Sequence, residues 1–167
     1  MAAGAAEATG DDGVPQGAAI VVTRDVGAPP QQVWRCLTAP ECFKVWWQEH
    51  LSFEPKLGGR FAAPFVDPSG KGRSVTAEVT AYHPPKGFVM VWADEAWDFD
   101  TVVSVSLEPT GAGTRVTIEH QGWEGAPEAD RAAFLLDHRA GWEHHLDSLA
   151  SHAETHDHGA DGADEGP

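Results

Sequence analysis

Two histidines stand where the sequence otherwise places apolar side chains. His120 follows Val116 and Ile118 at the two-residue period of a strand, and His138 interrupts the apolar stripe of a helix. A polar group on a buried face costs about 1–3 kcal/mol unless it has a partner. Imidazole titrates near neutral pH, so the pair could act as acid and base or could orient a ligand. The alternative is a core histidine bonded to backbone or water.

Stronger catalytic patterns are absent from the sequence. It contains no GxSxG, HExxH, P-loop or dinucleotide-binding fingerprint. Ser104 and Ser106 belong to the outward series of their strand, which argues against a serine nucleophile. The acidic segment from Asp94 to Asp100 is interpreted as a solvated loop. We therefore assign no catalytic residue.

The cysteines and the C-terminal histidines are the candidate metal ligands. Cys36 and Cys42 are too few for a disulfide framework and are interpreted as reduced, partly buried thiols. His152, His156 and His158 could chelate zinc or nickel, since the first two share one helix face. No second layer of partners supports this tail, so we expect only adventitious binding. The sequence thus predicts neither a metal centre nor a cofactor.

Composition and charge exclude several classes of protein. The 167 residues carry a net charge of −15 with only 11 Lys and Arg, which argues against binding to nucleic acids or to anionic membranes. No signal peptide or run of ~20 apolar residues is present, so we expect a cytoplasmic protein. Segments 1–19 and 154–167 are rich in Ala, Gly, Asp and Glu and are expected to be disordered tails. One domain, 20–153, remains.

The apolar periodicity of this domain changes along the chain. A β-branched run predicts a strand at 20–26, and helical spacing follows at 31–37 and 41–47. Two-residue alternation then predicts strands near 61–65, 75–81, 88–92, 103–107 and 116–120. Short, Gly- and Pro-containing connections favour an antiparallel meander that buries one face.

A long C-terminal helix is predicted to cover that face. The segment 127–153 carries one apolar stripe with steps of three and four residues, which is typical of a helix lying along a large surface. The stripe consists of Leu135, His138, Trp142, Leu146, Leu149 and Ala153. The predicted fold class is α+β: a curved antiparallel sheet of about six or seven strands wrapped around this helix, with two short helices after the first strand. Space between such layers suits small molecules.

Several segments resemble a known superfamily. They are RDVGAPPQQVWRCLT at 24–38, the Trp46-Trp47 pair in FKVWW, LGGRF at 57–61, TRVTIEHQGW at 114–123 and GWEHHLDSL at 141–149. Their order resembles the helix-grip fold of the START-like (SRPBCC) superfamily, in the branch similar to the activator of the heat-shock-protein-90 ATPase and its bacterial homologues. The resemblance implies an internal cavity for apolar compounds such as lipids, polyketides or hormones, with enzymes in a few branches. Eukaryotic co-chaperones of this family carry a further chaperone-binding domain, which neither 1–19 nor 154–167 is expected to supply.

We therefore expect a carrier or sensor that binds a small hydrophobic or aromatic molecule between the sheet and the C-terminal helix. The alternatives are a cyclase-, dehydratase- or hydrolase-type enzyme that uses cavity histidines, and a stress-response interaction module with outward-facing Trp97 and Trp123. Edge strands also allow a homodimer. The residues predicted to line the cavity are Trp46, Phe61, Phe65, Val79, Met90, Trp92, Val103, Val105, Ile118, His120, Phe134, His138 and Trp142.

Overall fold

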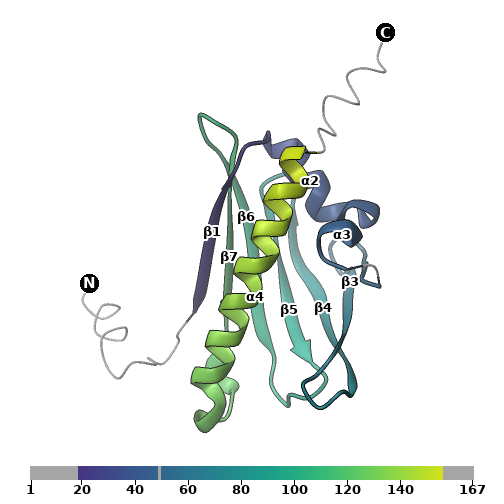
Figure 1. Cartoon of the computed structure of the whole chain (residues 1–167), viewed down its shortest axis with the longest axis vertical. Helices are drawn as coiled ribbons and strands as arrows, with labels where there is room; N and C mark the ends of the chain where they lie inside the picture. Colours follow the sequence, from purple (N-terminus) through teal and green to yellow (C-terminus); the bar gives the residue numbers. More distant parts are fainter. Residues whose placement is uncertain (1–18, 49, 156–167) are drawn as a thin grey trace, which may run out of the picture.

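The computed structural model describes residues 19–48 and 50–155. Seven strands form one antiparallel sheet in the order β1-β7-β6-β5-β4-β3-β2, and one long helix lies across it (Figure 1). The elements are β1 (Ile20–Val26), α2 (Pro30–Thr38), α3 (Pro40–Trp46), β2 (Ser52–Phe53), β3 (Arg60–Val66), β4 (Gly72–His83), β5 (Gly87–Asp94), β6 (Thr101–Pro109), β7 (Thr114–Gln121), the 3-10 turn η1 (Trp123–Gly125) and α4 (Glu128–Thr155). The predicted helix-grip architecture is confirmed.

Alternation along the strands sets which face of the sheet is buried. In β7 the side chains of Val116, Ile118 and His120 are buried. Arg115, which occupies an alternate position of the same strand, points outward and is exposed. The antiparallel register pairs Ile118 with Val105 and His120 with Val103, so inward residues of β6 and β7 form continuous rows. One apolar face results, and the helices cover it.

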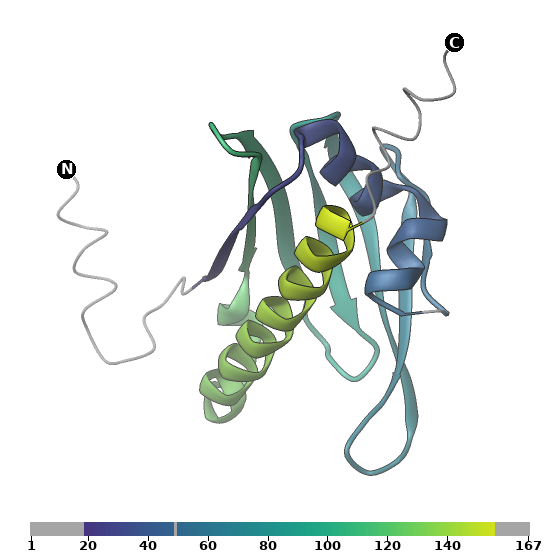
Figure 2. The ribbon, with the colours of Figure 1, turned by 45° about the horizontal axis from the view of Figure 1, so that its top comes forward.

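Helix α4 supplies most of that cover. Its predicted stripe is buried at Trp142, Leu146, Leu149 and Ala153, while its N-terminal part is less deeply buried. Figure 2 shows α4 running over the curved sheet, with α2 and α3 beside its C-terminal half. The helix continues to Thr155, beyond the predicted end. No helix among residues 19–48 and 50–155 is long and apolar enough to cross a membrane.

Helices α2 and α3 begin at prolines and are anchored by buried hydrogen bonds. Pro30 and Pro40 occupy the first helical turns, where a missing N–H costs nothing. Gln32 Nε2 of α2 donates to the carbonyl oxygen of Ala153 in α4 at 2.6 Å. Trp46 Nε1 of α3 donates to the carbonyl oxygen of Cys36 in α2 at 2.7 Å. Both short helices are thereby fixed to each other and to the end of α4.

Three local expectations were wrong or incomplete. The short strand β2 and the turn η1 were not predicted. Trp123 was expected to face outward but is fully buried, and its Nε1 donates to the carbonyl oxygen of His120 at 2.9 Å. Gly122, with φ of 98°, turns the chain back so that this tryptophan enters the core. His152 was expected at a frayed end of the predicted helix, without supporting partners, but lies buried in the last turns of α4, whereas His156 and His158 fall outside the described residues.

The close approach of β5 to β6 gives a test of the sheet. A Cβ added at Gly87 would meet the carbonyl oxygen of Val105 and, at 3.2 Å, the Cα of Ser106, whereas one added at Gly72 would meet nothing. We expect Gly87→Ala to lower the free energy of unfolding by about 1–3 kcal/mol, because backbone atoms must shift. Gly72→Ala should change it by less than about 0.5 kcal/mol. Urea denaturation of both variants measures this, and equal midpoints would contradict the strand packing.

Candidate functional site

Three tryptophans meet between the middle of α4 and the sheet. Trp142 of α4 lies with its ring centroid 5.4 Å from that of Trp92 in β5 and 5.6 Å from that of Trp47, the residue after α3. Trp47 and Trp142 meet nearly edge to face, at 85°. Aromatic pairs prefer such tilted contacts, and each ring buries about 150–250 Å². The cluster thus joins α3, α4 and β5 at one place.

His120 lies beneath this cluster in a chain of hydrogen bonds. Its Nδ1 accepts a hydrogen bond from Trp142 Nε1 at 3.0 Å. Its Nε2 lies 2.7 Å from the hydroxyl oxygen of Thr101, and that hydroxyl donates to the carbonyl oxygen of Trp92 at 3.2 Å. Because an indole N–H only donates, Nδ1 holds the lone pair and Nε2 carries the proton. Both ring nitrogens of His120 are therefore engaged.

The electrostatics of His120 keep it neutral. Burial, with a smaller contribution from the nearby His138, lowers its pKa to about 3. A neutral, fully buried imidazole with two partners has no lone pair left for a substrate. The sequence allowed His120 to be either a functional group or a hydrogen-bonded core histidine. Its burial and its two partners are those of a hydrogen-bonded core histidine.

Two adjoining hollows open beside the tryptophans, between α4 and strands β3 to β5. Their volumes are about 410 Å³ and about 130 Å³. Both are lined by Trp47, Trp92, His138 and His145, and we refer to them together as the helix–sheet cleft. The larger hollow is also lined by Gln48, Ala63, Phe65, Val75 and Asp94, and the smaller by Asp137, Gly141 and Trp142.

Two polar atoms of the cleft residues lack a hydrogen-bond partner. They are Trp92 Nε1 and His145 Nδ1, both buried from solvent. Buried polar groups are paired in the great majority of native structures, so an unpaired one needs an explanation. Both residues line both hollows, so the two unpaired nitrogens belong to residues of the cleft wall, although the atoms themselves are shielded from solvent.

The cleft histidines are neutral bases rather than cations. His138 Nδ1 lies 2.9 Å from the carbonyl oxygen of Phe134; because a carbonyl only accepts, Nδ1 carries the proton. Burial lowers the pKa of His138, although the Phe134 carbonyl, Asp137 and Asp94 raise it. His145 stacks on Trp47 with 3.9 Å between ring centroids, and burial lowers its pKa to about 4.

Formal charge in the cleft is negative. Asp94 lines the larger hollow and Asp137 the smaller one, and no Lys or Arg is among the described residues that line either. With neutral histidines, the cleft presents aromatic rings and two carboxylates. Such a site attracts cations and repels anions.

The residues predicted to line the cavity occupy three different places. Phe65, Trp92, His138 and Trp142 line the helix–sheet cleft. Phe134 lies near the start of α4, with its ring 5.6 Å from that of Trp97. The others are buried within the interior, away from the lining of the two hollows: Trp46, Phe61, Val79, Met90, Val103, Val105, Ile118 and His120.

Sequence reasoning missed two residues that line both hollows, Trp47 and His145. A signal for His145 was present, because positions 138, 142 and 145 follow helical steps of four and three and so share one face. Trp47 had only the spacing of Phe43, Trp46 and Trp47, which grouped these aromatic residues on one side of the helix predicted at 41–47 but did not place Trp47 in the cleft. It stands just past the end of α3, where helical periodicity no longer says which way a side chain points.

Together, the fold and the cleft define a helix-grip protein of the START-like superfamily. The sequence profile of the family described as "Activator of Hsp90 ATPase homolog 1-like protein" matches residues 27–154. The chain belongs to this family, and the resemblance noted in the sequence is confirmed.

Solved structures with this fold include proteins from bacteria. Protein MLL2253 of Mesorhizobium loti is 27% identical, with a TM-score of 0.66 over 83% of this chain and 98% of its own. A protein of Rhizobium leguminosarum is 23% identical, with a TM-score of 0.69 over 84% and 96%. DynU16, a protein of the dynemicin biosynthetic locus, is 25% identical, with a TM-score of 0.68 over 82% of this chain and 47% of its own. No curated protein matches the chain.

The buried neutral His120 makes stability depend on pH. Its folded pKa of about 3 lies below the ordinary value of about 6.5 in an unfolded chain, so the unfolded state binds the extra proton. Its contribution is full above pH 6.5 and is lost as the pH falls toward 3. Between pH 7 and 5, the free energy of unfolding should fall by about 2 kcal/mol more in the wild type than in His120→Gln.

Urea denaturation at a series of pH values measures this difference. His83→Gln serves as the matched control, because His83 is exposed on β4. The free energy of unfolding of His83→Gln should change with pH in the same way as that of the wild type. Parallel pH profiles for the wild type and His120→Gln would show that His120 is not buried in its neutral form.

Proposed function

We propose that the protein binds a small apolar or aromatic molecule in the helix–sheet cleft, as a carrier or a sensor. The observation that carries this proposal is a pair of adjoining hollows with aromatic walls and two unpartnered buried nitrogens. Ligand sites are mostly apolar concavities with a few polar groups that fix orientation. The larger hollow, of about 410 Å³, falls within the usual size range of such sites.

The polar atoms of the cleft indicate which functional groups and which charge the ligand carries. Trp92 Nε1 can only donate, so it calls for a ligand with an acceptor such as a carbonyl or hydroxyl oxygen. The carboxylates of Asp94 and Asp137 disfavour a ligand that carries its own carboxylate or phosphate. The expected ligand is therefore neutral or positively charged, with an aromatic or aliphatic body and at least one oxygen acceptor.

The similarity to DynU16 supports a role alongside small-molecule chemistry. DynU16 belongs to a biosynthetic locus, and its alignment with this chain includes most of the domain described here. Carriage of a product or sensing of a small molecule fits a cleft beside which His120 lies buried, outside the lining and with no free ring nitrogen. We accordingly place binding, rather than catalysis by His120, at the centre of the proposal.

Two dyes that differ by one charge test the charge preference of the cleft. N-phenyl-1-naphthylamine is neutral, and 8-anilinonaphthalene-1-sulfonate adds a sulfonate to the same rings. We expect the neutral dye to bind with an increase in its fluorescence, and the sulfonate to bind at least about tenfold more weakly, because an unfavourable charge contact of about 1.4 kcal/mol has that effect. Asp94→Asn should reduce this discrimination. Preference for the sulfonate would contradict the charge argument.

A pair of variants on β4 locates the bound dye. Val75 lines the larger hollow, whereas its neighbour Thr76 is exposed. Val75→Trp should fill the hollow and abolish binding of the neutral dye, and Thr76→Trp should leave it unchanged. Circular dichroism confirms that both variants fold. Unchanged binding in folded Val75→Trp would overturn the proposed site.

A further inference from the structure

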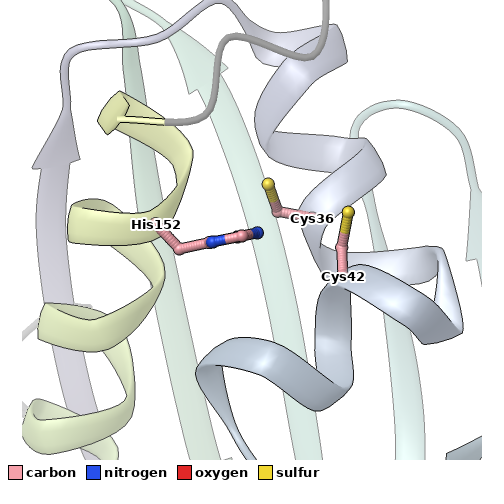
Figure 3. Close-up of side chains that lie close together, drawn as sticks. All are labelled: Cys36, Cys42 and His152. Carbon is pink, nitrogen blue, oxygen red and sulfur yellow. The ribbon is translucent and has the colours of Figure 1, made fainter.

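A group of side chains with metal-binding chemistry lies near the C-terminal end of α4, away from the cleft. Cys36 of α2, Cys42 of α3 and His152 of α4 bring one ligand atom each to within 4.8 Å of one another. Figure 3 shows the three side chains directed toward a common point between the helices. All three are buried, with exposed fractions of 0% for Cys36, 7% for Cys42 and 8% for His152.

The helices that carry these side chains are fixed by other contacts. Trp46 Nε1 donates to the carbonyl oxygen of Cys36, which holds α3 against α2. Gln32 Nε2 donates to the carbonyl oxygen of Ala153, the residue after His152, which holds α2 against α4. The three ligand atoms therefore come from a preformed scaffold rather than from a loose segment. Preformed geometry is what favours specific over adventitious ion binding.

We infer that Cys36, Cys42 and His152 form a site for one zinc-class divalent cation, with a water in the fourth position. Two thiolates and one imidazole are ligands that Zn²⁺ favours, at about 2.3 Å for sulfur and about 2.0–2.1 Å for nitrogen. In a tetrahedral site such atoms lie about 3.5–3.8 Å apart. The present separation of no more than 4.8 Å requires a contraction of only about 1 Å.

The charge balance of a buried site favours a divalent ion. Two thiolates and Zn²⁺ sum to zero, and a neutral imidazole adds nothing, so no net charge is buried. Cu⁺ has an affinity for the same ligands but would leave one uncompensated negative charge. The group contains no fourth Cys, His, Asp or Glu among the described residues. An open position for water therefore completes the tetrahedron.

Metal binding at this site is coupled to proton release. Burial, with smaller contributions from the adjacent Cys42, raises the pKa of the Cys36 thiol to about 12. Burial and Glu41 raise the pKa of Cys42, while Arg35 opposes both shifts. A thiol with an ordinary pKa of about 8.5 is already mostly protonated near neutral pH, so both cysteines carry a proton before metal binds. Binding forms two Zn–S bonds and one Zn–N bond and releases two protons to solvent, with no change of oxidation state.

Titration of the full chain with Zn²⁺ and Co²⁺ under a phosphine reductant tests the site. We expect one equivalent of Zn²⁺ to bind in competition with a chromophoric chelator and to raise the thermal unfolding midpoint. Co²⁺ should produce the intense near-ultraviolet absorption of a thiolate complex. Cys42→Ser and His152→Gln should each weaken Zn²⁺ binding strongly, and Cys42→Ser should reduce the thiolate absorption. Circular dichroism shows whether each variant folds, and His152→Gln remains informative if a cysteine variant does not.

The double variant His156→Ala/His158→Ala is the matched control. It keeps His152 and removes the other histidines of the C-terminal tail, so it should bind one Zn²⁺ like the wild type. Loss of binding in this variant would assign the metal to the tail and overturn the internal site. Absence of stoichiometric binding, or of thiolate absorption with Co²⁺, would overturn it equally. Dye binding in the cleft is measured without added metal, so each proposal can fail alone.

Discussion

A chain of hydrogen bonds ties helix α4 to the sheet, and the shape of the cleft depends on it. Trp142 donates to His120, His120 donates to the hydroxyl of Thr101, and that hydroxyl donates to the carbonyl oxygen of Trp92. The chain thus crosses from α4 through β7 and β6 to β5. Each of these polar groups is buried, and each would cost about 1–3 kcal/mol without its partner. All of these hydrogen bonds can form only if α4 lies within a narrow range of rotations about its axis and of distances from the sheet.

That rotation determines what lies in the cleft. Positions 138, 142 and 145 share one face of α4, so the turn that brings Trp142 to His120 also brings His138 and His145 to the cleft. On the sheet side, Ala63 and Val75 are short and leave room that the surrounding aromatic rings do not fill. A hydrogen bond needed for stability and a cleft suited to a ligand therefore follow from one geometric constraint.

The sequence predicted what periodicity controls and missed what depends on three-dimensional placement. The alternation through Val116, Ile118 and His120 identified the inward face of β7, and the stripe through Leu146 and Leu149 identified the buried face of α4. Periodicity assigns a face but not a depth. It therefore could not separate inward residues that fill the core, such as Val103, from those that border a hollow, such as Phe65.

The partners of single side chains were beyond the sequence for a related reason. His152 falls at the end of the predicted helix and begins a His-rich stretch, and only the packing of α4 beside α2 and α3 brings it to two cysteines more than 100 positions away. Trp123 reads as part of a connection because Gly122 reverses the chain by a turn that no apolar pattern records. Such contacts depend on how the folded chain brings elements together in space, and no local pattern in a single sequence reveals that arrangement.

Helix α3 connects the cluster of Cys36, Cys42 and His152 to the cleft. It carries Cys42 in its first turn and ends at Trp46, immediately before Trp47, whose ring stacks on His145 in the cleft wall. An ion held between Cys42 and His152 would fix α3 against α4 at one end, and the stack of Trp47 on His145 joins them at the other. Restricting the motion of α3 would order a cleft wall without contact between ion and ligand.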